Sequence, residues 1–159
     1  MEKLDVLSNV LERQHDFIRR TDAKLVLTLP IATIMLGSFS AALAQRGNFD
    51  SFHLALYFMT SVSLLFVFIF SFFAINPHVL SSVKEGKIFA GHISTIELKD
   101  YVEAWNDYDS DALIDDFASQ IHVNASIAMK KFRSVSRSLT CLTFAIPLCL
   151  AIVIFICVP

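Results

Sequence analysis

Three apolar stretches, each long enough to cross a lipid bilayer, dominate this chain of 159 residues. They cover residues 24–44, 52–75 and 138–158, and only Lys24, at the edge of the first, carries a charge. A membrane-spanning helix needs about 20 consecutive apolar residues. In lipid, the backbone has to satisfy its own hydrogen bonds, which favours helices here. The sequence therefore predicts three transmembrane helices, the first two forming a hairpin over residues 24–75.

The composition excludes several other classes of protein. Hydrophobic residues make up 55% of the chain and charged residues 18%, with a mean hydropathy of +0.58. These values are more apolar than those of soluble domains. The formal net charge of −2 argues against a nucleic-acid partner held by phosphate neutralisation.

The distribution of basic residues predicts the orientation. Of the 13 Lys and Arg residues, only Arg46 lies between the first two spans, which leaves 13 − 1 = 12 for the other side. Basic residues concentrate on the cytoplasmic side of membrane proteins. We therefore expect the N-terminal segment and residues 76–137 in the cytoplasm, and Pro159 outside.

The cytoplasmic segments are predicted to be helical. Residues 1–23 form an amphipathic helix, and residues 76–137 form a helical region with helices over 78–86 and 87–105. A long helix from residue 110 continues without a break into the third span. The fold class is thus an all-α membrane protein with three transmembrane helices, a cytoplasmic helical bundle, and a last span continuous with a long cytoplasmic helix. The apolar residues of the two amphipathic stretches are Leu4, Leu7, Leu11, Phe17 and Ile18, and Ile114, Phe117, Ile121, Ala128, Phe132 and Val135.

The chain carries no recognisable catalytic chemistry. HExxH, GxSxG, CxxC and GxxxxGK sequences are all absent, and its five His residues are scattered. The spans contain no ionisable relay of the kind that pumps need. We therefore expect no enzyme, no catalytic residue, no metal and no bound cofactor.

Basic side chains gather at the cytoplasmic ends of the first and third spans. Such a collar commonly meets anionic lipid head groups, and the same charges can meet the phosphate of a ligand. Asp22 and Lys24 also allow a purely structural reading, an ion pair where the first helix enters the membrane. The candidates for phosphate binding are Arg19, Arg20, Lys24, Lys130, Lys131 and Arg133.

Short motifs spread over nearly the whole chain give it a family resemblance. Asp22-Ala23-Lys24 stands at the mouth of the first span, and Gly91 lies in an aromatic-Gly-x-Ile element at residues 89–93. Asn124 follows Gln120-Ile121 before a basic pair and the last span. With these motifs the chain resembles the transmembrane effectors of Pycsar, the pyrimidine-cyclase anti-phage system of bacteria. The residues that match the family motifs are Asp22, Lys24, Gly91 and Asn124.

The resemblance implies a multi-pass protein of the bacterial inner membrane that acts in abortive infection. It implies an activating cyclic nucleotide, cUMP or cCMP, made by a partner nucleotide cyclase and bound on the cytoplasmic side. The spans would then impair the membrane. Three helices cannot enclose much of a pore, so we expect any conductance to need a homo-oligomer in contact with membrane lipid.

Two alternatives remain open. Eight acids against the single base Lys99 in residues 97–116 could recruit a soluble protein to a membrane scaffold. The chain could also be a small constitutive channel or lytic protein, toxic without any messenger.

Overall fold

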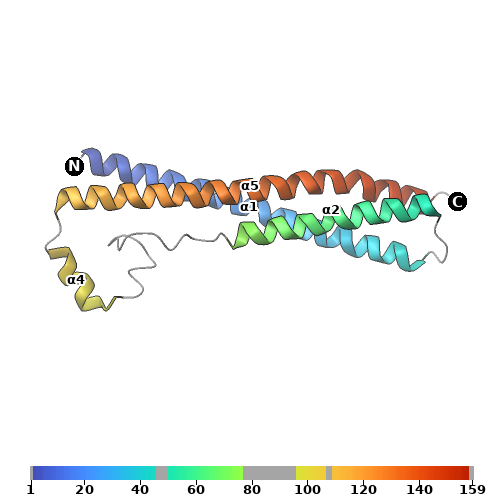
Figure 1. Ribbon diagram of the computed structural model, residues 1–159, viewed down its shortest axis with the longest axis horizontal. Coiled ribbons are helices and arrows are strands. Elements are labelled where there is room, and N and C mark those ends of the chain that lie inside the picture. Colours follow the sequence, from blue (N-terminus) through green and yellow to red (C-terminus); the bar gives the residue numbers. More distant parts are fainter. Residues whose placement is uncertain (1, 46–49, 77–95, 107–108, 158–159) are drawn as a thin grey trace. The chain divides into compact units, whose positions relative to one another are not determined.

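The computed structural model describes residues 2–45, 50–76, 96–106 and 109–157, and the regular structure within these ranges is helical (Figure 1). The fold class is confirmed: three of the helices are long and apolar enough to cross a membrane. The last of them joins the third span to the preceding polar segment without interruption. The helices are α1 (Glu2–Gln45), α2 (Ser51–Ile75), α4 (Leu98–Asn106) and α5 (Ser110–Cys157).

One sequence-based expectation about the polar segment is wrong. A single helix over residues 87–105 is excluded because Ile96 and Glu97 are not helical, and α4 begins at Leu98. The first backbone bond of α4, from Tyr101 N to the Glu97 carbonyl, marks this start. The expected helix over 78–86 and the motif residue Gly91 lie outside the described residues.

The long helices run through their prolines, and a backbone hydrogen bond marks the start of α5. Pro30 lies inside α1 and Pro147 inside α5, which transmembrane helices tolerate. Leu113 N donates to the Asp109 carbonyl over 3.1 Å, so α5 starts after Asp109 as the sequence predicts.

The chain divides into two compact units. One comprises Met1–Arg19 and His78–Met129, and the other comprises Arg20–Pro77 and Lys130–Pro159. The second contains the apolar stretches, and we call it the membrane unit. We call the first the polar unit.

Three layers of buried side chains hold the membrane unit together. Each layer contains residues from α1, α2 and α5. From one layer to the next, the residue numbers increase in α1 and α5 and decrease in α2. The two helices α1 and α5 are therefore parallel, and α2 is antiparallel to both (Figure 1). The layers are Leu25, Ala74 and Val135; then Ala32, Leu64, Val67, Leu142 and Ala145; then Phe39, Tyr57 and Ile152.

The buried positions of the membrane unit repeat every three or four residues. A period of 3.5 residues is that of left-handed coiled coils, in which side chains of one helix fit between those of the next. Many of these positions hold Ala, Ser or Thr, and small side chains let membrane helices approach closely. The series are Thr21, Leu25, Thr28, Ala32 and Phe39 in α1, Tyr57, Thr60, Leu64, Val67, Ser71 and Ala74 in α2, and Val135, Ser138, Leu142, Ala145 and Ile152 in α5.

The polar unit shows the same spacing in the first part of α1, where Leu4, Leu7, Leu11 and Ile18 are partly buried. The expectation that Phe17 belongs to this face is wrong, because its side chain is 40% exposed. Position 17 falls outside a repeat that passes through residues 14 and 18.

Candidate functional site

Among the described residues of the membrane unit, the most enclosed charged side chain belongs to an ion pair between α1 and α5. Lys131 Nζ lies 2.8 Å from Asp22 Oδ1 and 2.9 Å from Oδ2, and donates to both oxygens. The Lys131 side chain is 14% exposed and that of Asp22 is 45% exposed. The pair therefore faces the interior of the bundle on one side and its surroundings on the other.

Lys131 occupies a position that the helical repeat assigns to the core. It lies four residues before Val135, the α5 member of the nearest buried layer. The sequence predicted apolar Phe132 on this face, but Phe132 is 39% exposed and Lys131 takes the inner position. Burial of an unpaired ammonium lowers the stability of a fold. Asp22 of α1 lies beside Lys131 of α5 and supplies the opposite charge.

The expected ion pair between Asp22 and Lys24 is replaced by this contact. Residues two apart on a helix do not face each other, so Lys24 points away from Asp22. The Lys24 ammonium instead lies 5.9 Å from the centre of the Phe132 ring. That distance is within reach of a cation–π attraction.

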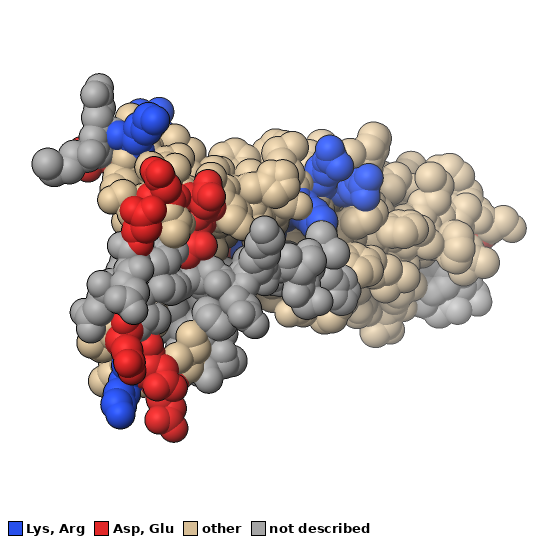
Figure 2. All heavy atoms as spheres, turned by 60° about the vertical axis from the view of Figure 1, so that its left-hand side comes forward, with Lys and Arg blue, Asp and Glu red and all other residues tan. Residues whose placement is uncertain are grey.

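The other basic candidates are exposed. Lys130 and Arg133 lie three residues apart on α5, and Arg20 and Lys24 lie four apart on α1. Such spacings put each pair on one face of its helix. Arg19 belongs to the polar unit. Figure 2 shows Lys and Arg side chains (blue) in separate groups on the face in view, and Asp and Glu side chains (red) in groups of their own.

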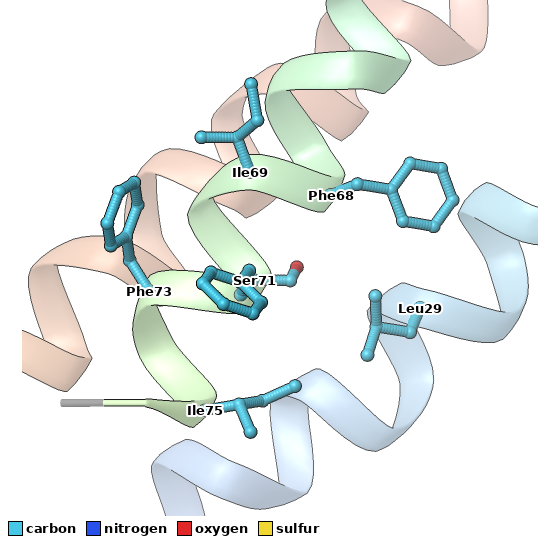
Figure 3. Close-up of a pocket in the computed structure, with 7 residues that line it drawn as sticks. Leu29, Phe68, Ile69, Ser71, Phe73 and Ile75 are labelled. Atoms are coloured by element: carbon cyan, nitrogen blue, oxygen red, sulfur yellow. The ribbon is translucent and has the colours of Figure 1, made fainter.

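An apolar groove opens beside the ion pair, between α1 and α2. Its polar end is lined by Asp22, Lys131, Leu25, Val26, Leu29, Pro30 and Ile75 and has a volume of about 560 Å³. A second section of about 580 Å³ shares Leu29 and Ile75 and continues along Phe68, Ile69, Ser71, Phe72 and Phe73. Figure 3 shows Leu29 of α1 on one side of this section, with Phe68 and Ile75 of α2 on the other.

Buried hydroxyl groups connect α2 to α5 within the membrane unit. Ser71 Oγ and Ser138 Oγ lie 2.9 Å apart, and Ser138 Oγ donates to the Val67 carbonyl over 3.1 Å. Ser63 Oγ donates to the Cys141 carbonyl over 2.9 Å. Ser71 and Ser138 are 67 residues apart in the sequence, and only the three-dimensional register of α2 against α5 brings them together.

The polar unit has a hydrogen-bonded cluster of its own. Asn124 is buried, with 7% of its surface exposed. Its Nδ2 lies 3.3 Å from His15 Nε2, and its Oδ1 accepts from Gln120 Nε2 over 3.2 Å. The motif residue Asn124 thus fixes α1 against α5 in this unit, which is a reason for an amide at that position.

Comparison with protein families places the chain beside known proteins. The family described as the Pycsar effector protein domain matches residues 6–158, which is nearly the whole chain and includes all three spans. No curated protein and no solved structure gives a significant match.

Proposed function

The chain belongs to the Pycsar effector family of anti-phage defence proteins, and from this premise we propose that it senses a cyclic nucleotide and impairs the inner membrane. The messenger is a cyclic pyrimidine nucleotide, cUMP or cCMP, supplied by the partner cyclase of the system. Binding takes place on the cytoplasmic side, and the response is a loss of membrane integrity that ends the infection.

The orientation that this function requires follows from the basic residues. With 12 of 13 Lys and Arg residues on one side, the polar unit is cytoplasmic and the connection around Arg46 is outside. An alkaline phosphatase fusion placed after residue 48 should be active, because that enzyme folds only outside the cytoplasm. A fusion after residue 106 should be inactive.

The observation that carries the proposal is the continuity of two helices. Both α1 and α5 supply residues to the polar unit and to the membrane unit, and each is helical without interruption from one to the other. A rotation or shift of either helix in the polar unit can therefore be passed along its backbone to the spans. Because the side chains of the layers are tightly packed, such a movement switches them between distinct packing arrangements and does not deform them gradually.

Exposed basic side chains are the proposed contacts for the messenger phosphate. Lys130 and Arg133 share a face of α5, and both are open to a ligand. Arg20 and Lys24 offer a second such face on α1. Lys131 is held by both oxygens of Asp22, so we assign it to the coupling of α1 with α5 rather than to first contact with the phosphate.

Expression in bacteria with and without the partner cyclase tests the proposal. We expect normal growth with the effector alone, and loss of membrane potential and growth arrest once an active cyclase supplies the messenger. A catalytically dead cyclase is the matched control. Arrest by the effector alone would favour a constitutive lytic protein. No depolarisation, together with a co-purifying soluble protein, would favour a scaffold that uses its acidic helices.

A further inference from the structure

The groove between α1 and α2 has the features of a site for one lipid. We propose that it holds an acyl chain of a phospholipid whose head group carries both a phosphate and a primary ammonium, namely phosphatidylethanolamine. The head group lies against Asp22 and Lys131 at the polar end of the groove. This inference depends on the membrane location of the chain and is independent of the proposed messenger.

The walls of the groove fit an acyl chain. Apart from the ion pair and Ser71, its lining is aliphatic or aromatic. Ser71 bonds to Ser138, so its hydroxyl already has a partner. The two sections have volumes of about 560 and 580 Å³ and share Leu29 and Ile75. Each lies within the range of about 300–1,000 Å³ that is typical of sites for organic ligands.

The depth of the groove fits a phospholipid lying along the helices. Leu29 follows Asp22 by seven residues, which corresponds to about 10 Å along a helix axis at 1.5 Å per residue. A head group at the ion pair therefore places the start of its acyl chain beside Leu29. The chain then continues between Phe68 and Phe72 of α2, deeper in the span.

The charges at the mouth of the groove select the head group. Asp22 is 45% exposed, and its carboxylate has lone pairs beyond those that Lys131 uses. Lys131 has three N–H donors, of which Asp22 takes two. A zwitterion can place its ammonium on Asp22 and its phosphate near Lys131. A purely anionic head group has no ammonium to place on Asp22, and a trimethylammonium group cannot donate a hydrogen bond to it.

Lipid binding to the purified full chain tests the proposal. The delipidated protein in detergent is titrated with phosphatidylethanolamine, phosphatidylcholine and phosphatidylglycerol of identical acyl chains, with native mass spectrometry and the thermal midpoint as readouts. We expect phosphatidylethanolamine to bind about tenfold more tightly than the other two, a difference of about 1.4 kcal/mol. Soluble glycerophosphoethanolamine should not bind at the same concentrations, because it has no acyl chain.

Substitutions locate the site. Leu29→Trp fills the groove and should lower the affinity for phosphatidylethanolamine about tenfold. Leu27→Trp is the matched control, because Leu27 is on the same helix, is 68% exposed and does not line the groove. Ile75→Trp fills the groove from α2 and keeps the test decisive if Leu29→Trp does not fold. Asp22→Asn should remove the preference for phosphatidylethanolamine over phosphatidylcholine.

Three results would overturn the proposal. The first is equal binding of the three lipids by the native chain. The second is binding by the groove-filling variants that matches the Leu27→Trp control. The third is binding of the soluble head group as tightly as the whole lipid, which would describe a free ligand site and not a lipid groove.

Discussion

Lys131 donates to both carboxylate oxygens of Asp22, at 2.8 and 2.9 Å, and so ties α5 to α1 just before the Leu25–Val135 layer begins. Its side chain is the more enclosed of the two, at 14% exposure against 45%. An ion pair at a core position specifies the register of two helices more than it adds to their stability. We infer that the pair helps to fix the register of α1 against α5 where the spans begin.

Removal of the two charges should have unequal effects. Asp22→Asn leaves the enclosed Lys131 ammonium unpaired and should cost about 2 kcal/mol, less than a fully buried pair would because Asp22 is partly exposed. For a chain of this size, that cost corresponds to a fall of about 4–8 °C in the thermal midpoint. Lys131→Met leaves only the more exposed carboxylate and should lower the midpoint by less. Thermal unfolding in detergent measures both, and an equal or reversed effect contradicts the burial argument.

A larger side chain at position 138 should destabilise the protein. Ser138 is fully buried between α2 and α5, so Ser138→Leu should overpack the interface and cost about 2 kcal/mol. Ser138→Ala keeps the close approach and loses only hydrogen bonds that average about 0.6 kcal/mol in membranes. Ser136→Leu, at an exposed position of the same helix, is the control. A thermal midpoint of Ser138→Leu equal to that of Ser136→Leu would show that α2 and α5 do not pack here.

His15 and Asn124 should be energetically coupled. A double-mutant cycle with His15→Ala and Asn124→Ala should give a coupling of about 1 kcal/mol, the typical net value of a hydrogen bond. His122 is exposed on α5, and a cycle that pairs His15→Ala with His122→Ala should give no coupling. The measurement is the free energy of unfolding in detergent. Additive single effects for His15 and Asn124 would show that the two side chains do not interact.

The exposed basic face of α5 should control sensitivity to the messenger. The double variant Lys130→Ala/Arg133→Ala should raise the messenger concentration for half-maximal response by about tenfold or more. Its insertion into the membrane should be unchanged, because both side chains are exposed. Lys99→Ala on α4 removes one basic charge elsewhere and should leave the response unaltered. An unchanged response of the double variant would exclude this face as the phosphate contact.

Sequence reasoning predicted the helical class, the three spans and the helix that continues from residue 110 into the membrane, because long apolar runs leave few structural choices. The predicted buried positions were wrong where a residue of a neighbouring helix decides which side chain lies inside. Phe132 has the apolar character of a core residue, yet Lys131 takes the core position because Asp22 of α1 is within reach. The seven-residue repeat could have flagged Lys131, since it lies four residues before Val135. The pairing of Ser71 with Ser138 depended on the register of α2 against α5, which no local pattern contains.

Leakage from liposomes is the most direct test of the central claim that a cyclic nucleotide opens the membrane through this protein. The purified full chain is reconstituted in vesicles that hold a fluorescent dye, its insertion is verified, and cUMP, cCMP and cyclic dinucleotides are titrated in turn. We expect tight vesicles without ligand and dose-dependent release with cUMP or cCMP, weakened in the Lys130→Ala/Arg133→Ala variant. Intact vesicles with every nucleotide, or release without any, would contradict it.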